Sequence, residues 1–90
     1  MIKRDIIGTM EVDMNTLVLS CRGCPTIFEW KDIDGDSYYF RLRHGGWYIY
    51  DEIEGEIVVD GYGDKGLDGI CDWEDVKRLA RKEGLVIKEK

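Results

Sequence analysis

Three cysteines and a single histidine are the residues of this 90-residue chain best suited to hold a transition metal. Cys21 and Cys24 form a C-x-x-C pair, which is half of a common zinc-binding arrangement. His44 and Cys71 would complete a Cys3His set, which binds Zn²⁺ tetrahedrally. The alternative is that the cysteines are small apolar side chains with no metal and that the histidine lies at a turn. Zinc is one of two metal hypotheses, and calcium is the other.

Aspartates and glycines are concentrated in residues 64–75, which read DKGLDGICDWED. Carboxylate and carbonyl oxygens are the ligands of Ca²⁺, and glycine permits the tight curl that brings them together. The stretch resembles the calcium loop of the EF-hand family, and its final aspartate before a helix is closest to dockerin-type loops. The resemblance implies a calcium site whose ligands are Asp64, Asp68, the carbonyl of Ile70, Asp72 and Asp75.

The same loop has a second interpretation that involves no metal. It departs from the family pattern at Gly66 and Cys71, and a strand is expected before it where the family has a helix. Glycine and aspartate are also the residues that dominate ordinary surface loops. Asp72, with Asp75 three residues later, predicts a capping box at the start of a helix. Capping and calcium binding are compatible, so both stay open.

Tyrosines and arginines share one face of a predicted strand pair. Residues 36–43 alternate with period two, which puts apolar side chains on one face and mostly polar ones on the other. Such a surface suits contact with a protein, and it would also suit stacking of single-stranded bases. We expect an unknown protein partner to bind the side chains of Tyr39, Arg41, Arg43, Tyr48 and Tyr50.

The charge balance excludes some classes of partner. Lys and Arg number 13 and Asp and Glu number 19, so the net charge is 13 − 19 = −6. Duplex nucleic acid is not an expected partner, because phosphate binding needs basic surface. No apolar run approaches the ~18 residues of a membrane span, so no membrane partner is expected. An odd number of cysteines and no leader-like start predict a reducing, cytoplasmic location.

Catalytic motifs are missing from the sequence. There are two serines and one histidine, with no G-x-S-x-G nucleophile motif. The glycine-rich stretch lacks the G-K-[ST] ending of a phosphate-binding loop. We therefore expect a small non-enzymatic binding or accessory module that acts through protein–protein contact, with an optional calcium loop. The alternatives are a structural zinc protein or an uncharacterised small enzyme.

Short β-rich runs, separated by turn residues, must position these side chains. Asp34-Gly35 predicts a two-residue hairpin, Gly45-Gly46 a second tight turn, and Met14-Asn15 a turn between two early strands. Strands are expected at residues 9–13, 16–21, 26–33, 36–43, 47–51, 56–60 and 85–87. The segment from Cys24 to Tyr50 resembles a recurrent aromatic hairpin of small uncharacterised prokaryotic and viral proteins, which implies aromatic strands and no particular activity.

A single helix is expected after the glycine-rich stretch. Asp72 caps it, Val76, Leu79 and Ala80 share its apolar face, and Gly84 ends it. The expected fold is a single α+β domain spanning 1–90, with an antiparallel meander of about five or six strands packed against this C-terminal helix. One Asn, no Gln and 36% charged residues favour a heat-adapted source. The resemblance of the segment from Cys24 to Tyr50 implies a microbial source, archaeal or viral.

Overall fold

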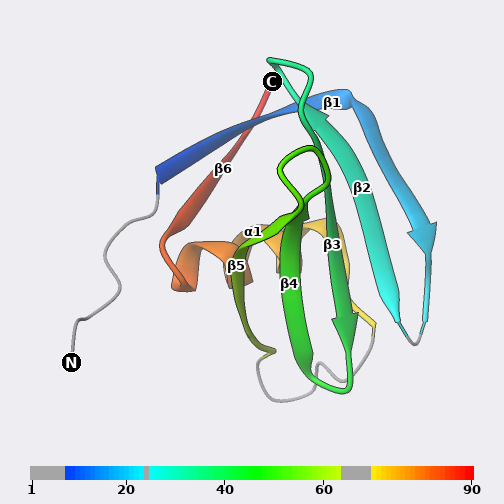
Figure 1. Ribbon diagram of the computed structural model, residues 1–90. Helices are drawn as coiled ribbons and strands as arrows, with labels where there is room; N and C mark the ends of the chain where they lie inside the picture. Colours follow the sequence, from blue (N-terminus) through cyan, green and yellow to red (C-terminus); the bar gives the residue numbers. More distant parts are fainter. Residues whose placement is uncertain (1–7, 24, 64–69) are drawn as a thin grey trace.

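The computed structural model describes residues 8–23, 25–63 and 70–90 (Figure 1). The described part of the chain has the α+β composition expected from the sequence, with six strands and one helix. The elements are β1 Gly8–Cys21, β2 Thr26–Asp32, β3 Ser37–Arg43, β4 Gly46–Asp51, β5 Glu56–Tyr62, α1 Trp73–Lys82 and β6 Leu85–Glu89.

The sheet is mixed, so the expectation of a simple antiparallel meander was wrong. The strand order is β5-β4-β3-β2-β1-β6, and every neighbouring pair is antiparallel except β1 and β6, which are parallel. The reason is the helix between β5 and β6. It carries the chain from one edge of the sheet to the other, where β6 runs in the same direction as β1.

Strand β1 is shared between two partners, and this curls the sheet. Its first part, Gly8 to Val12, pairs with β6, while pairing with β2 begins at Val12 and continues to Cys21. The predicted turn at Met14-Asn15 was wrong: the chain bends there within one strand and does not reverse. The ladder is irregular at this point, and the Thr16 hydroxyl accepts a hydrogen bond from the Lys31 amide at 2.8 Å. The result is a half-barrel, as Figure 1 shows.

The two central hairpins form where the sequence predicts them, but both turns differ in detail. The β2–β3 loop spans residues 33–36 because the Asp32 carboxylate accepts hydrogen bonds from the Asp34 and Asp36 amides, at 2.9 and 3.0 Å. The β3–β4 turn consists of His44 and Gly45, with φ of 53° and 81°. Positive φ at both turn residues matches the right-handed twist of the two strands.

The core lies between the concave face of the sheet and α1. The predicted apolar face of β3 is buried, as is the predicted helix face. Helix α1 contacts β6 and β5, which are the two edge strands, and therefore bridges the opening of the half-barrel. The largest fully buried side chains are Phe40, Leu42, Ile49, Leu79, Val12, Val59 and Val76.

Hydrogen bonds and an ion pair stabilise the first turns of helix α1. Asp72 accepts a hydrogen bond from the Asp75 amide and Asp75 accepts one from the Asp72 amide, both at 3.0 Å, which confirms the predicted capping box. Glu89 of β6 accepts a hydrogen bond from the Trp73 indole at 2.8 Å and pairs with Lys77 at 2.9 Å. Lys77 first, and then Trp73, lower the pKa of the Glu89 carboxyl. The helix is thereby tied to the strand that follows it.

The length of α1 bears on the expectation that no membrane is involved. A helix needs about 20 residues to cross the hydrocarbon core of a bilayer. Helix α1 has 10, and no helix among the described residues combines the necessary length with the necessary apolar character.

Candidate functional site

The predicted partner-binding side chains lie together on the convex face of the sheet. We call Tyr39, Arg41, Arg43, Tyr48 and Tyr50 the tyrosine face. Their neighbours along β3 and β4 are buried, so the alternation of a strand turns these five outward. In the ladder Tyr39 is opposite Tyr50, and Arg41 is opposite Tyr48. The structure thus brings this predicted set together on two adjacent strands.

Three of these side chains form a packed aromatic cluster. The ring of Tyr39 lies 6.0 Å from that of Tyr48 and 5.3 Å from that of Tyr50, between centroids. Such distances are typical of favourable tilted and edge-to-face aromatic pairs. Partial burial, followed by a hydrogen bond with Tyr48, raises the pKa of the Tyr39 hydroxyl. The three rings therefore pack against one another on two adjacent strands of the sheet.

The aromatic surface continues onto the edge strand β5. Ile57 pairs with Tyr50 in the ladder and is 51% exposed, while Tyr62 near the end of the strand is 81% exposed. At this end a cleft of about 400 Å³ is lined by Arg41, Arg43, His44, Tyr48, Asp60 and Tyr62, among others. The tyrosine face therefore runs from an aromatic centre to a margin that holds Arg41 and Arg43 together with Asp60.

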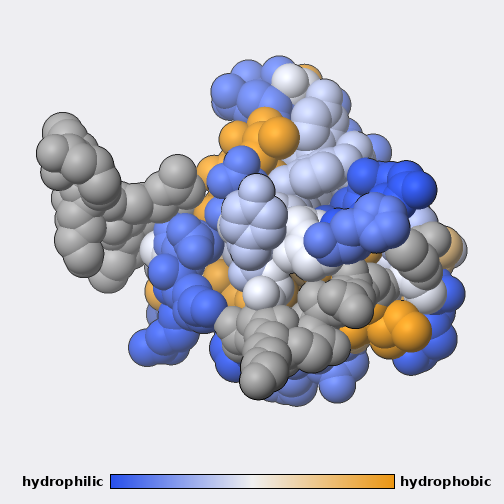
Figure 2. Space-filling model, turned by 90° about the horizontal axis from the view of Figure 1, so that it is seen from below, coloured by the Kyte–Doolittle hydropathy of each residue, from blue (hydrophilic) through white to orange (hydrophobic). Residues whose placement is uncertain are grey.

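Charge is segregated between the two ends of the sheet. Successive hairpin turns lie at opposite ends, so His44 and the adjacent Arg43 fall at one end and both acidic turns at the other. Figure 2 views the molecule from below, the end with the β3–β4 turn, where hydrophilic surface is interrupted by hydrophobic patches. The opposite end carries the acidic residues Asp32, Asp34, Asp36, Asp51, Glu52 and Glu54.

Only some of the predicted calcium ligands lie within the described residues. Asp64 and Asp68 lie outside the described residues, and Ile70 is exposed before the helix. Asp72 and Asp75 cap α1, and Asp75 also pairs with Arg78 at 3.0 Å. A calcium ion bound by Asp75 would have to share that carboxylate with the helix terminus. Calcium binding in the loop stays a prediction.

Calcium binding has a direct thermal test. We expect 5 mM CaCl₂ to raise the melting temperature of the wild-type protein, because an ion that binds only the folded state stabilises it in proportion to the logarithm of its concentration over Kd. The rise should vanish in Asp68→Ala. Magnesium at the same concentration serves as the control for ionic strength. Equal shifts with both salts, or in both proteins, would contradict the prediction.

The zinc residues are not gathered in the described part of the chain. Cys21 ends β1, His44 lies at the β3–β4 turn, and Cys71 is buried before α1, while Cys24 lies outside the described residues. Among residues 8–23, 25–63 and 70–90, no three His, Cys, Asp or Glu side chains come together as a group that could hold a metal ion. Burial, and after it Asp75 and Asp72, raise the pKa of the Cys71 thiol to about 12, which disfavours the thiolate that zinc needs.

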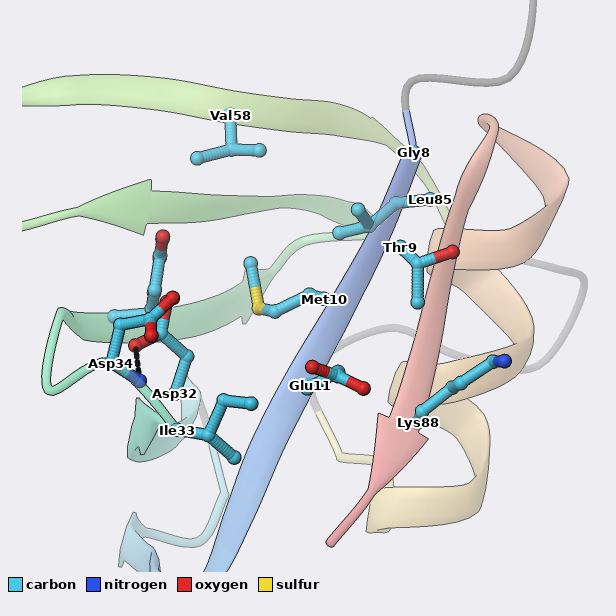
Figure 3. Close-up of a pocket in the computed structure, with 11 residues that line it drawn as sticks. Gly8, Thr9, Met10, Glu11, Asp32, Ile33, Asp34, Val58, Leu85 and Lys88 are labelled. Carbon is cyan, nitrogen blue, oxygen red and sulfur yellow. Dashed lines mark hydrogen bonds between the residues drawn. The ribbon is translucent and has the colours of Figure 1, made fainter.

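One cleft was not anticipated from the sequence. It has a volume of about 560 Å³ and is lined by residues of β1, β3, β5, β6 and the β2–β3 turn (Figure 3). Its residues are far apart in the chain and follow no short motif. The relevant local pattern is the acidic Asp32–Asp36 segment, for which the sequence predicts a hairpin turn, with metal binding as the less favoured alternative.

Comparison of the chain with family models, with curated protein sequences and with solved structures finds no match. Functional inference therefore depends on the surfaces described above.

Proposed function

We propose that this protein is a small non-enzymatic binding module that contacts another protein through the tyrosine face. The observation that carries the proposal is the cluster of Tyr39, Tyr48 and Tyr50, packed ring against ring on the solvent side of the sheet. A partner that covers this cluster would remove its apolar area from water, which favours association.

The types of these residues and their position on central strands favour contact with a protein. Tyrosine and arginine are enriched among the residues that dominate binding energy at protein interfaces. Tyrosine offers a large amphipathic area with few rotatable bonds, so little entropy is lost on binding. Since β3 and β4 are central strands with partners on both sides, the face is already ordered before any partner arrives.

The charges around the cluster supply orientation. Arg41 and Arg43 lie on the same face as the tyrosines, and no acidic residue of the described chain lies within ion-pair distance of either. A complementary partner would present apolar side chains to the tyrosines and carboxylates to the arginines. Such pairs at an interface margin act mainly on the association rate, which falls as salt increases.

The partner can be trapped and the face tested in two steps. A photo-crosslinking phenylalanine analogue at position 48 is close in shape to tyrosine, and the same analogue at Lys82 on α1 is the matched control. Crosslinking in the native cells should give one discrete adduct at position 48 and none at position 82. An identical adduct pattern at both positions would contradict the proposal.

Tyr48→Ala should then weaken binding of the purified partner by about thirtyfold, the size expected for a buried aromatic hot spot of about 2 kcal/mol. Titration calorimetry of both proteins measures this ratio. Lys82→Ala should change the dissociation constant less than twofold. A change below about threefold for Tyr48→Ala would remove the tyrosine face as the contact surface.

A further inference from the structure

The half-barrel does not close, and the cleft of about 560 Å³ lies at its opening. Val58 comes from β5, one edge of the sheet, and Leu85 comes from β6, the other edge. Met10 of β1, Ile33 of the β2–β3 turn and Tyr38 of β3 add to the apolar lining, and Figure 3 shows the side chains of Met10 and Leu85 directed towards Val58. The cleft is thus on the concave side of the sheet, whereas the tyrosine face is on the convex side.

The lining combines an apolar floor with an acidic rim. Met10, Tyr38 and Leu85 are buried core residues that still line the cleft. The acidic groups are Asp32 at the end of β2, Asp34 of the β2–β3 turn and Glu11 of β1.

The Asp32 carboxylate is held in a fixed position. One of its oxygens accepts hydrogen bonds from the Asp34 and Asp36 amides at 2.9 and 3.0 Å. Because the turn backbone orients this carboxylate, its charge is preorganised at the end of the apolar floor. A ligand that pairs with Asp32 therefore does not have to order it first.

The electrostatic environment of the cleft is negative. Burial first, then the charges of Asp32, Asp51 and Asp36, and last a hydrogen bond to the Asp32 carboxylate raise the pKa of the Tyr38 hydroxyl far above its ordinary range. Glu11 is partly neutralised by Lys90 at 3.4 Å. Lys88 is the one basic residue among the described lining residues, and Figure 3 shows its side chain extending away from Asp32. A cation at Asp32 meets a favourable field.

We propose that this cleft binds an aliphatic ammonium group, with its hydrocarbon chain on Met10 and Leu85 and its charge beside Asp32. A bare metal ion fits less well, because the described residues gather no three carboxylate, histidine or cysteine groups around one point. An ammonium ion with an alkyl stem matches both the acidic rim and the apolar floor. A free polyamine and the lysine side chain of a protein share this chemistry.

The first test compares three six-carbon probes by NMR. At pH 7, n-hexylamine is a cation, hexan-1-ol is neutral and hexanoate is an anion. We expect n-hexylamine to shift the methyl signals of Met10 and Leu85 and to bind about tenfold more tightly than hexan-1-ol, with no saturable effect of hexanoate. Equal binding of the amine and the alcohol, or no shift at these methyl groups, would overturn the proposal.

The second test removes the charge and keeps the turn. Asp32→Asn retains a side-chain oxygen that can accept hydrogen bonds from the Asp34 and Asp36 amides, so the loop should fold. Because the substitution removes the negative charge, it should weaken n-hexylamine binding about tenfold. Asp60→Asn makes the same change of net charge on the convex face and should alter binding less than twofold. If Asp32→Asn proves unstable, Asp34→Asn replaces it, with the same expected direction. If Asp32→Asn and Asp60→Asn weaken n-hexylamine binding equally, the effect comes from the net charge of the protein and not from the cleft, and the proposal is wrong.

The source of the ammonium group is then assigned by competition. Displacement of n-hexylamine by spermidine at lower concentration than by N-acetyl-lysine methylamide supports a free polyamine, and the reverse order supports a lysine side chain. If neither compound displaces the probe, the proposal fails. The probes and the Asp32→Asn variant leave the five residues of the tyrosine face unchanged, so these measurements succeed or fail independently of the proposed protein contact.

Discussion

Leu79→Ala is expected to lower the free energy of unfolding by about 3 kcal/mol, within the range of about 2–5 kcal/mol found for such core truncations. Leu79 is 1% exposed and lies on the face of α1 that meets the core. Alanine is the better helix former, so the loss measures packing and not helix propensity. Since a domain of this size is stabilised by roughly 5–13 kcal/mol, the change is a large fraction of the total.

Urea denaturation followed by tryptophan fluorescence measures this loss. Arg81→Ala, an exposed position two residues further along the same helix, is the matched control and should stay within about 0.5 kcal/mol of wild type. A loss below about 1 kcal/mol for Leu79→Ala would mean that α1 does not hold the two edges of the half-barrel together. The cleft at that opening would then lack a defined shape.

The Cys71 thiol is expected to react with a disulfide reagent at pH 8 at least about a hundredfold more slowly in the native protein than in denaturant. Its pKa rises from 9.0 to about 12 on folding, chiefly through burial, which lowers the thiolate population about a thousandfold. The greater nucleophilicity of a high-pKa thiolate offsets part of this factor. The thiol is also only 5% exposed, so the reagent reaches it poorly.

The measurement uses a variant in which Cys71 is the only thiol, made by replacing Cys21 and Cys24 with serine. The matched control retains only Cys21, which is partly exposed and should be slowed much less. The raised pKa also has a consequence for stability. Because the folded state holds this proton more tightly, its contribution is complete below pH 9 and is lost as the pH rises from 9 towards 12. Native reaction as fast as denatured reaction would contradict both statements.

Slow reaction of the native Cys71 thiol would argue against zinc binding at the cysteines. A zinc site would require Cys71 to lose its proton and to leave its buried position beside Asp72 and Asp75. A thiol that is protected in metal-free protein and exposed by unfolding supports a core role. A thiol protected only when zinc is present would instead support the Cys3His set.

Local patterns in the sequence determined most of the elements. Period-two alternation predicted the buried and outward faces of β3, and the tyrosine face followed directly from it. The Asp72 and Asp75 pair predicted the start of α1, because a capping box satisfies amide groups within one turn of the chain. These features depend on residues within one helical turn, one strand or two strands joined by a tight turn, so they can be inferred without knowing the fold.

Long-range placement was decided only by the tertiary structure. The Met14-Asn15 segment resembles a turn in sequence, but whether a chain bends or reverses depends on the strand available to pair with it, and here β2 and β6 share β1. The parallel pairing of β6 depends on where α1 crosses the sheet. The cleft joins Met10, Asp32, Val58 and Leu85, which no sequence spacing relates. Such a site exists only because the sheet curls and fails to close, and that follows from pairing between strands distant in the chain.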